Sequence, residues 1–140
     1  MNKLKALLVL LLATGAVQVA HAQDSTKMAR VYFVRSTGYS GSLLTFHCFI
    51  DSSVVCGLKN NQYSEHLIAP GKHQLDVAAH SKNFTNSKQS LTITAVAGQS
   101  YYIKIMPVKG YDNKVKMLSV SENTIRPVLA KCTPKTDCLQ

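Results

Sequence analysis

The sequence predicts an all-β fold, an antiparallel β-sandwich of about seven or eight strands that ends in a short helix or an irregular tail. Short segments rich in β-branched and aromatic residues alternate apolar and polar positions, which is the period of a strand with one buried face. Turn residues separate these segments roughly every 8–12 residues. The sequence shows neither a long amphipathic segment nor a regular alternation of strands with helices.

The first 22 residues have the features of a secretory signal peptide. Lys3 and Lys5 precede the apolar run Ala6–Ala13, and Ala20-His21-Ala22 supplies small residues at a peptidase site. The run is shorter than the roughly 20 residues that a transmembrane helix needs. We therefore expect cleavage near Ala22 and a periplasmic or secreted protein. No cysteine lies near this site, so a lipid anchor is not expected.

The remaining residues, 23–140, are predicted to form a single β-sandwich domain, with a core at 29–120 and a tail at 121–140. The formal net charge is +9, of which the signal peptide supplies two. The basic residues are scattered along the chain, which is typical of a solvated surface. The charge is compatible with an anionic envelope polymer or an envelope protein as partner. No motif for nucleic-acid binding is present, and we expect none to bind.

Eight strands are expected in chain order. Their predicted ranges are Ala29–Arg35, Leu43–Ile50, Val54–Leu58, Gln62–Ala69, Lys72–Ala79, Lys88–Val96, Ser100–Val108 and Lys114–Val120.

Pro70 and Gly71 are predicted to form the tip of a central hairpin between two of these strands. Proline presets φ for the second position of a turn, and glycine tolerates the positive φ that often follows. Leu75 and Val77 alternate with polar residues on one side, and Leu67 and Ala69 give a weaker alternation on the other. Further hairpins are expected before and after it.

After the last strand, Ser121–Lys131 has no clear period. Ser121 is a suitable helix N-cap, whereas Pro127 is tolerated only in a first turn. A short helix or an irregular cover is predicted here.

An even number of cysteines in a small exported domain predicts disulfide bonds. The four are Cys48, Cys56, Cys132 and Cys138. Four cysteines allow three connectivities, and the sequence does not choose among them. Local geometry favours Cys48–Cys56, because a hairpin around Asp51-Ser52-Ser53 places these two opposite each other. Cys132 and Cys138 would then close the tail.

In order, Ala29–Arg35, Ile50-Asp51, Cys56-Gly57-Leu58, Ala69–His73 and Ala97–Ile103 resemble a bacterial family of small envelope proteins, domain of unknown function 2846. The Pro-Gly-Lys-His element is also similar to the PEGA domain, a surface β-module. The resemblance covers about Ala29–Val120. It implies a sandwich of the prealbumin or carboxypeptidase-regulatory kind and brings no catalytic residues. The chain departs from the family in its four cysteines and in lacking a lipidation cysteine.

Histidines are the candidate metal ligands, and His66, His73 and His80 follow one another at intervals of seven. On the predicted strands nothing makes them converge, so surface histidines are the expectation and a metal site is the alternative. Catalysis by Cys48 with a nearby histidine is disfavoured, because a disulfide would remove the nucleophile. Three of the seven carboxylates, Asp51, Asp112 and Asp137, fall in predicted turns, so paired catalytic carboxylates are poorly supplied. We therefore expect neither an enzyme nor a cofactor.

Two tyrosines, Tyr39 and Tyr111, lie in glycine-flanked loops and are the candidate binding residues. The function expected from the sequence is a non-enzymatic module that binds or scaffolds a partner at the cell envelope. The alternatives are a histidine-based metal-binding protein and an exported protein inhibitor, for example of a lysozyme. The basic charge disfavours the last, since lysozymes are typically basic as well.

Overall fold

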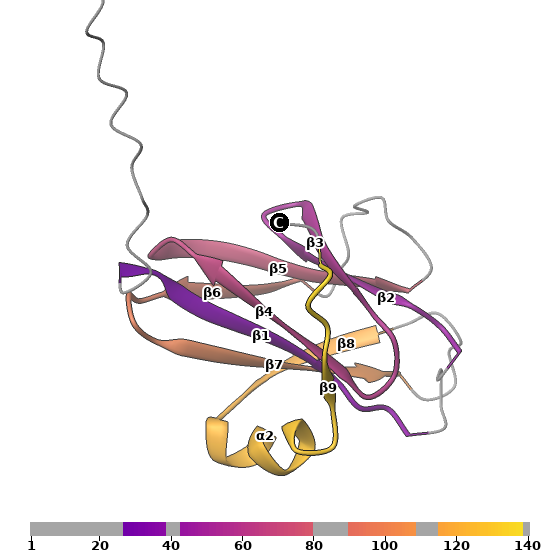
Figure 1. Cartoon of the computed structure of the whole chain (residues 1–140). Helices are drawn as coiled ribbons and strands as arrows, with labels where there is room; N and C mark the ends of the chain where they lie inside the picture. Colours follow the sequence, from indigo (N-terminus) through magenta and orange to yellow (C-terminus); the bar gives the residue numbers. More distant parts are fainter. Residues whose placement is uncertain (1–26, 39–42, 80–89, 109–114, 139–140) are drawn as a thin grey trace, which may run out of the picture.

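A computed structural model describes residues 27–38, 43–79, 90–108 and 115–138. Within these ranges the chain forms nine strands in two sheets and one helix, which confirms the predicted all-β sandwich with a short C-terminal helix. The two sheets lie face to face, and the helix covers the outer side of the five-stranded sheet (Figure 1).

The larger sheet, here sheet A, has the strand order β8-β7-β1-β4-β9. Its strands are β1 (Ala29–Arg35), β4 (Gln62–Ile68), β7 (Ser100–Pro107), β8 (Val115–Val120) and β9 (Thr133–Pro134). β1 pairs antiparallel with β4 and parallel with β7, and the short β9 runs parallel to β4. Sheet A is therefore a mixed sheet, which contains both parallel and antiparallel neighbours.

The smaller sheet, here sheet B, is wholly antiparallel and has the order β3-β2-β5-β6. Its strands are β2 (Phe46–Ile50), β3 (Ser53–Leu58), β5 (Gly71–Ala79) and β6 (Leu91–Ala95). The β2–β3 hairpin forms as predicted, with Cys48 directly opposite Cys56.

The core lies between the sheets and is made by alternate residues of each strand. Sheet A contributes Val31, Phe33, Ile103 and Ile105, and sheet B contributes Phe46, Leu58, Leu75 and Ile93. All are buried, as the period-two pattern of the sequence predicts.

The prediction of a central hairpin is wrong, because β4 and β5 do not pair with each other. β4 pairs with β1 and β9, whereas β5 pairs with β2 and β6, so Pro70-Gly71 carries the chain from one sheet to the other. Gly71 has a φ of 137°, which favours glycine. Alternation did not distinguish the two cases, because strands on facing sheets also send every second side chain into the same core.

Helix α2 (Glu122–Leu129) follows β8 and packs on sheet A through the fully buried Ile125. Ser121 is the N-cap, and its hydroxyl accepts a hydrogen bond from the Thr124 N–H. Pro127 lies in the second turn rather than the first, and the helix ends two residues later. The short helix, one of the two predicted alternatives, is thus observed.

Arg35, at the end of β1, is fully buried in the sandwich. Its Nη1 donates to the carbonyl oxygens of Leu44 and Leu58, both at 2.6 Å, and its guanidinium lies 3.7 Å from the centroid of the Phe46 ring. Burial lowers the pKa of Arg35 to about 10, so the side chain is charged at neutral pH. One cation therefore joins the end of β1 to the chain before β2 and to the end of β3.

Candidate functional site: a cleft at the free edge of β4

A cleft of about 760 Å³ lies along β4, at the edge where the C-terminal tail passes. Its apolar walls come from both sheets and the tail: Ile50, Val55, Leu67, Ile68 and Pro134. Its polar lining residues are Tyr63, Glu65, His66, Lys135 and Thr136. The consecutive residues 65–68 all take part, and neighbouring side chains of a strand point to opposite faces. The cleft therefore wraps around the edge of β4.

The tail covers only the first part of this edge. The Thr133 N–H donates to the Asn61 carbonyl at 2.9 Å, and the Lys135 N–H donates to the Tyr63 carbonyl at 2.8 Å. The pairing of β9 with β4 is limited to Gln62 and Tyr63. Backbone groups that point to one side of a strand recur at every second residue. Those of Glu65 and Leu67 therefore point to the same edge as the Tyr63 carbonyl, beyond the end of β9.

Charged side chains at the cleft are paired with one another. Glu65 lies 3.5 Å from Arg30, and the Lys135 ammonium contacts the Asp137 carboxylate. Each pair has at least one partner that is half or more exposed, and such pairs contribute little to stability. The cleft thus offers apolar walls and paired charges rather than one uncompensated sign.

A single disulfide, Cys56–Cys138, fastens the tail to β3 across 82 residues of sequence. Cys48 and Cys132 are free thiols. The predicted pairs Cys48–Cys56 and Cys132–Cys138 are therefore wrong. Cys48 does face Cys56 as expected, but the β9 pairing brings the tail to the free edge of β3, so Cys138 also reaches Cys56.

The two free thiols are poor nucleophiles. Cys48 is fully buried, and burial strongly raises its pKa even though the nearby Arg35 charge acts in the opposite direction. Burial also raises the pKa of Cys132. The thiolate is the reactive form, so neither residue has the character of a catalytic cysteine.

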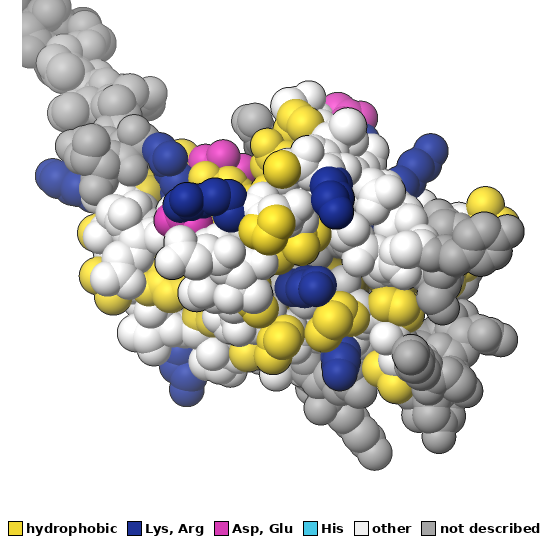
Figure 2. Space-filling model, turned by 90° about the horizontal axis from the view of Figure 1, so that it is seen from below, with side chains coloured by type: hydrophobic (Ala, Val, Ile, Leu, Met, Phe, Trp, Pro, Cys, Tyr) yellow, Lys and Arg dark blue, Asp and Glu magenta, His cyan; other side chains and the backbone are white. Residues whose placement is uncertain are grey.

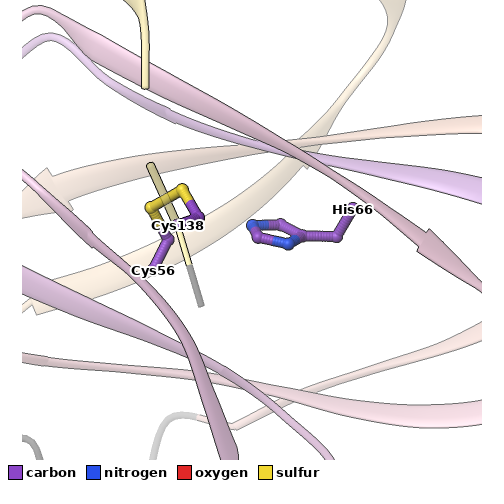
Figure 3. A group of neighbouring side chains, drawn as sticks. All are labelled: Cys56, His66 and Cys138. Atoms are coloured by element: carbon purple, nitrogen blue, oxygen red, sulfur yellow. A yellow bond between two sulfur atoms is a disulfide. The ribbon is translucent and has the colours of Figure 1, made fainter. Parts of the chain in front are cut away.

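His66 is positioned by β4 so that its ring points toward the disulfide (Figure 3). Its ring meets Phe33 edge-on at a centroid distance of 5.9 Å, and Nε2 lies 2.9 Å from the Ser64 hydroxyl. Burial lowers the pKa of His66 and outweighs the opposing charge of Glu65, so the ring is neutral at pH 7. A metal-ligand atom of each of His66, Cys56 and Cys138 lies within 4.8 Å of the others.

His73 does not join this group. Its Nδ1 contacts Asp51 and its Nε2 contacts the Ala69 carbonyl, so both nitrogens are engaged. His80 and the binding candidates Tyr39 and Tyr111 lie outside the described residues. Of the candidate histidine ligands that the structure describes, His66 lies beside two cysteines and His73 lies elsewhere. Sequence reasoning missed the two cysteine neighbours of His66, because no spacing rule connects three residues on β3, β4 and the tail.

The outer face of sheet A carries a second feature that sequence reasoning did not single out. Tyr32 and Tyr102 lie opposite each other on β1 and β7, and their rings stack at a centroid distance of 4.9 Å. Seen from below, the molecule shows Lys and Arg side chains spread among apolar and other side chains, with several close together beside Asp and Glu toward one end (Figure 2). The basic residues thus do not form one continuous patch on this face.

No protein-family model matches the chain, and no curated protein matches it significantly. Within the described ranges, no helix is long and apolar enough to cross a membrane.

Proposed function

We propose that the chain is an exported, non-enzymatic β-sandwich that binds an extended segment of a protein partner along the free edge of β4 in the cell envelope. The observation that carries this proposal is the strand edge itself. The pairing of β9 with β4 ends at Tyr63, and among the described residues no strand covers the same edge at Glu65 and Leu67, which lies beside an apolar cleft. An unpaired edge accepts a further strand through main-chain hydrogen bonds, while neighbouring pockets select side chains.

Export is the other half of the proposal. The disulfide is typical of an oxidising compartment outside the cytosol. The signal-peptide features of the sequence agree with it, and so does the resemblance of residues 29–120 to small envelope proteins. Intact mass of the protein recovered from the periplasm or medium tests this part. We expect a chain that begins at Gln23, and a protein retaining residues 1–22 would contradict it.

Two leucines provide a matched test of the binding edge. Leu67 is 47% exposed on β4, and Leu118 is 50% exposed on β8 at the opposite edge of the same sheet. A photo-crosslinking amino acid is placed at each position in turn, and the cells are irradiated. We expect discrete protein adducts from position 67 and not from position 118. Equal yields, no adduct at either position, or an adduct with polysaccharide alone would each contradict the proposal.

A backbone variant separates strand addition from simple apolar contact. Leu67→Pro removes an N–H that points to the free edge, and proline is tolerated on edge strands. Leu67→Ala removes the side chain but keeps the N–H. With the crosslinker moved to Glu65, we expect Leu67→Pro to abolish the adduct and Leu67→Ala to weaken it. Retention of the adduct in a folded Leu67→Pro protein would argue against main-chain pairing.

A further inference from the structure

The side chains of Cys56, His66 and Cys138 form the one group of three close metal-ligand residues within the described part of the chain. They come from β3, from β4 and from the tail, so the group lies where the edges of both sheets meet (Figure 3). Cys56 is buried, and His66 and Cys138 are half-buried in the cleft wall. Its ligand atoms all lie within 4.8 Å of one another.

Two cysteine sulfurs and an imidazole are a ligand set of defined preference. Thiolates select Cu⁺ and Zn²⁺ over Mg²⁺ or Ca²⁺, and imidazole suits both of the former. Three protein ligands with an open fourth position are also a known arrangement for zinc. The Ser64 hydroxyl lies 2.9 Å from Nε2. It would remain as an outer partner of the ring if the cation binds Nδ1, and it would have to move aside if the cation binds Nε2.

From this geometry we infer that reduction of the Cys56–Cys138 bond turns the group into a site for one thiophilic cation, Cu⁺ or Zn²⁺. The inference is independent of the proposed strand-binding role.

A small thiol is the reductant that opens the Cys56–Cys138 bond. Two thiol molecules are oxidised to one disulfide, the Cys56–Cys138 bond breaks, and each cysteine sulfur gains a proton. The cation then displaces both protons to solvent as two metal–sulfur bonds form. The oxidised chain has no thiolate in the group and does not bind.

The tail has the freedom that this step requires. On a tetrahedral metal the two sulfurs lie roughly 3.8 Å apart, so Cys138 must withdraw slightly from Cys56. Among the described tail residues, Lys135 makes the last backbone hydrogen bond to β4, and Cys138 follows three residues later. The tail can therefore stay anchored at Tyr63 while Cys138 moves.

The test compares oxidised protein with protein reduced by a phosphine and desalted without oxygen. One equivalent of Zn²⁺ or Cu⁺ is added in separate arms, and native mass spectrometry counts bound ions. A chromophoric chelator measures affinity by competition. We expect one ion per reduced chain and none on the oxidised chain. The arm in which one ion binds to the reduced chain identifies the cation as Zn²⁺ or Cu⁺. Absence from both arms, or equal binding by the oxidised chain, would overturn the inference.

Variants locate the site and guard against binding by an unfolded chain. Cys138→Ser and His66→Asn are each expected to lower affinity at least tenfold, the scale on which ligand and outer-shell losses act. Cys132→Ser and His73→Asn are the matched controls and should leave affinity unchanged. In an unfolded chain the cysteines are equivalent, so an equal loss in Cys132→Ser and Cys138→Ser would refute the site. Circular dichroism of each reduced variant accompanies the measurement.

Discussion

His73 Nδ1 lies 2.6 Å from Asp51 Oδ2, and Nε2 of the same ring lies 2.8 Å from the Ala69 carbonyl oxygen. Both partners accept hydrogen bonds, so the ring satisfies them together only when both of its nitrogens are protonated. Burial of the ring acts against the charge, but these bonds and the Asp51 charge raise the pKa of His73 above 6.5. The contact joins the β2–β3 turn to β5.

Stability should depend on pH through this pair. The contribution of His73 is complete below its unfolded pKa and is lost as pH rises through the higher folded pKa. Burial acts to raise the pKa of Asp51, but hydrogen bonds from Gln74 and His73 lower it below 3.8. The Asp51 contribution is therefore complete above the unfolded pKa and is lost as pH falls through the lower folded pKa. The pair stabilises most between about pH 4 and 6.5.

Unfolding by denaturant across this range tests the pair. His73→Gln is expected to destabilise the protein by up to about 1 kcal/mol near pH 5, a modest loss because the pair is partly exposed. The loss should be smaller at pH 8 and at pH 3, where one partner of the pair is uncharged. Lys72→Gln removes a neighbouring exposed charge and is the control, with no comparable maximum near pH 5. A His73→Gln loss that is constant from pH 3 to 8 would show that the imidazolium is not the stabilising form.

Arg35→Met should destabilise the sandwich by about 2–4 kcal/mol, because the buried carbonyl of Leu58 and the partly buried carbonyl of Leu44 each lose a charged donor. The matched control is Arg30→Met on the same strand, where the side chain is half exposed and its ion pair with Glu65 is long. That loss should stay below about 1 kcal/mol. The free energy of unfolding of each variant is compared with that of the unchanged protein. Similar losses for the two variants would mean that Arg35 acts only through packing.

The strand bounds were predictable where alternation and turn residues coincide. β1 has the predicted range Ala29–Arg35, and Cys48 faces Cys56 as the short hairpin requires. Both features depend on neighbours in sequence, and local residue preferences report on such neighbours.

The assignment of strands to sheets was not predictable in the same way. Pro70-Gly71 has the residues of a hairpin tip, yet the next strand joins the other sheet, because the partners of β4 and β5 are set by contacts distant in sequence. The cleft was missed for the same reason. It exists because Thr133 and Pro134 pair with β4, and two such residues carry no strand pattern.

Cys138→Ser should weaken the fold substantially. The Cys56–Cys138 bond closes a loop of 82 residues, and the chain-entropy model assigns about 4–5 kcal/mol to a loop of this size. Disulfides often stabilise proteins by less than this model assigns. We therefore expect Cys138→Ser to lower the free energy of unfolding by about 3–5 kcal/mol. Cys132→Ser is the control and should cost less than about 1 kcal/mol, because this thiol is partly exposed and unbridged. Comparable losses for the two variants would argue against the bond.

Thiol labelling counts the bridges directly. Without reductant, native protein should take up one alkyl group slowly at Cys132, because Cys48 is buried. In denaturant without reductant both free thiols, Cys48 and Cys132, should react, and reduction should expose Cys56 and Cys138 as well. Intact mass resolves each step. A protein that stays unlabelled in denaturant would contain two bridges, which would contradict the free thiols at Cys48 and Cys132.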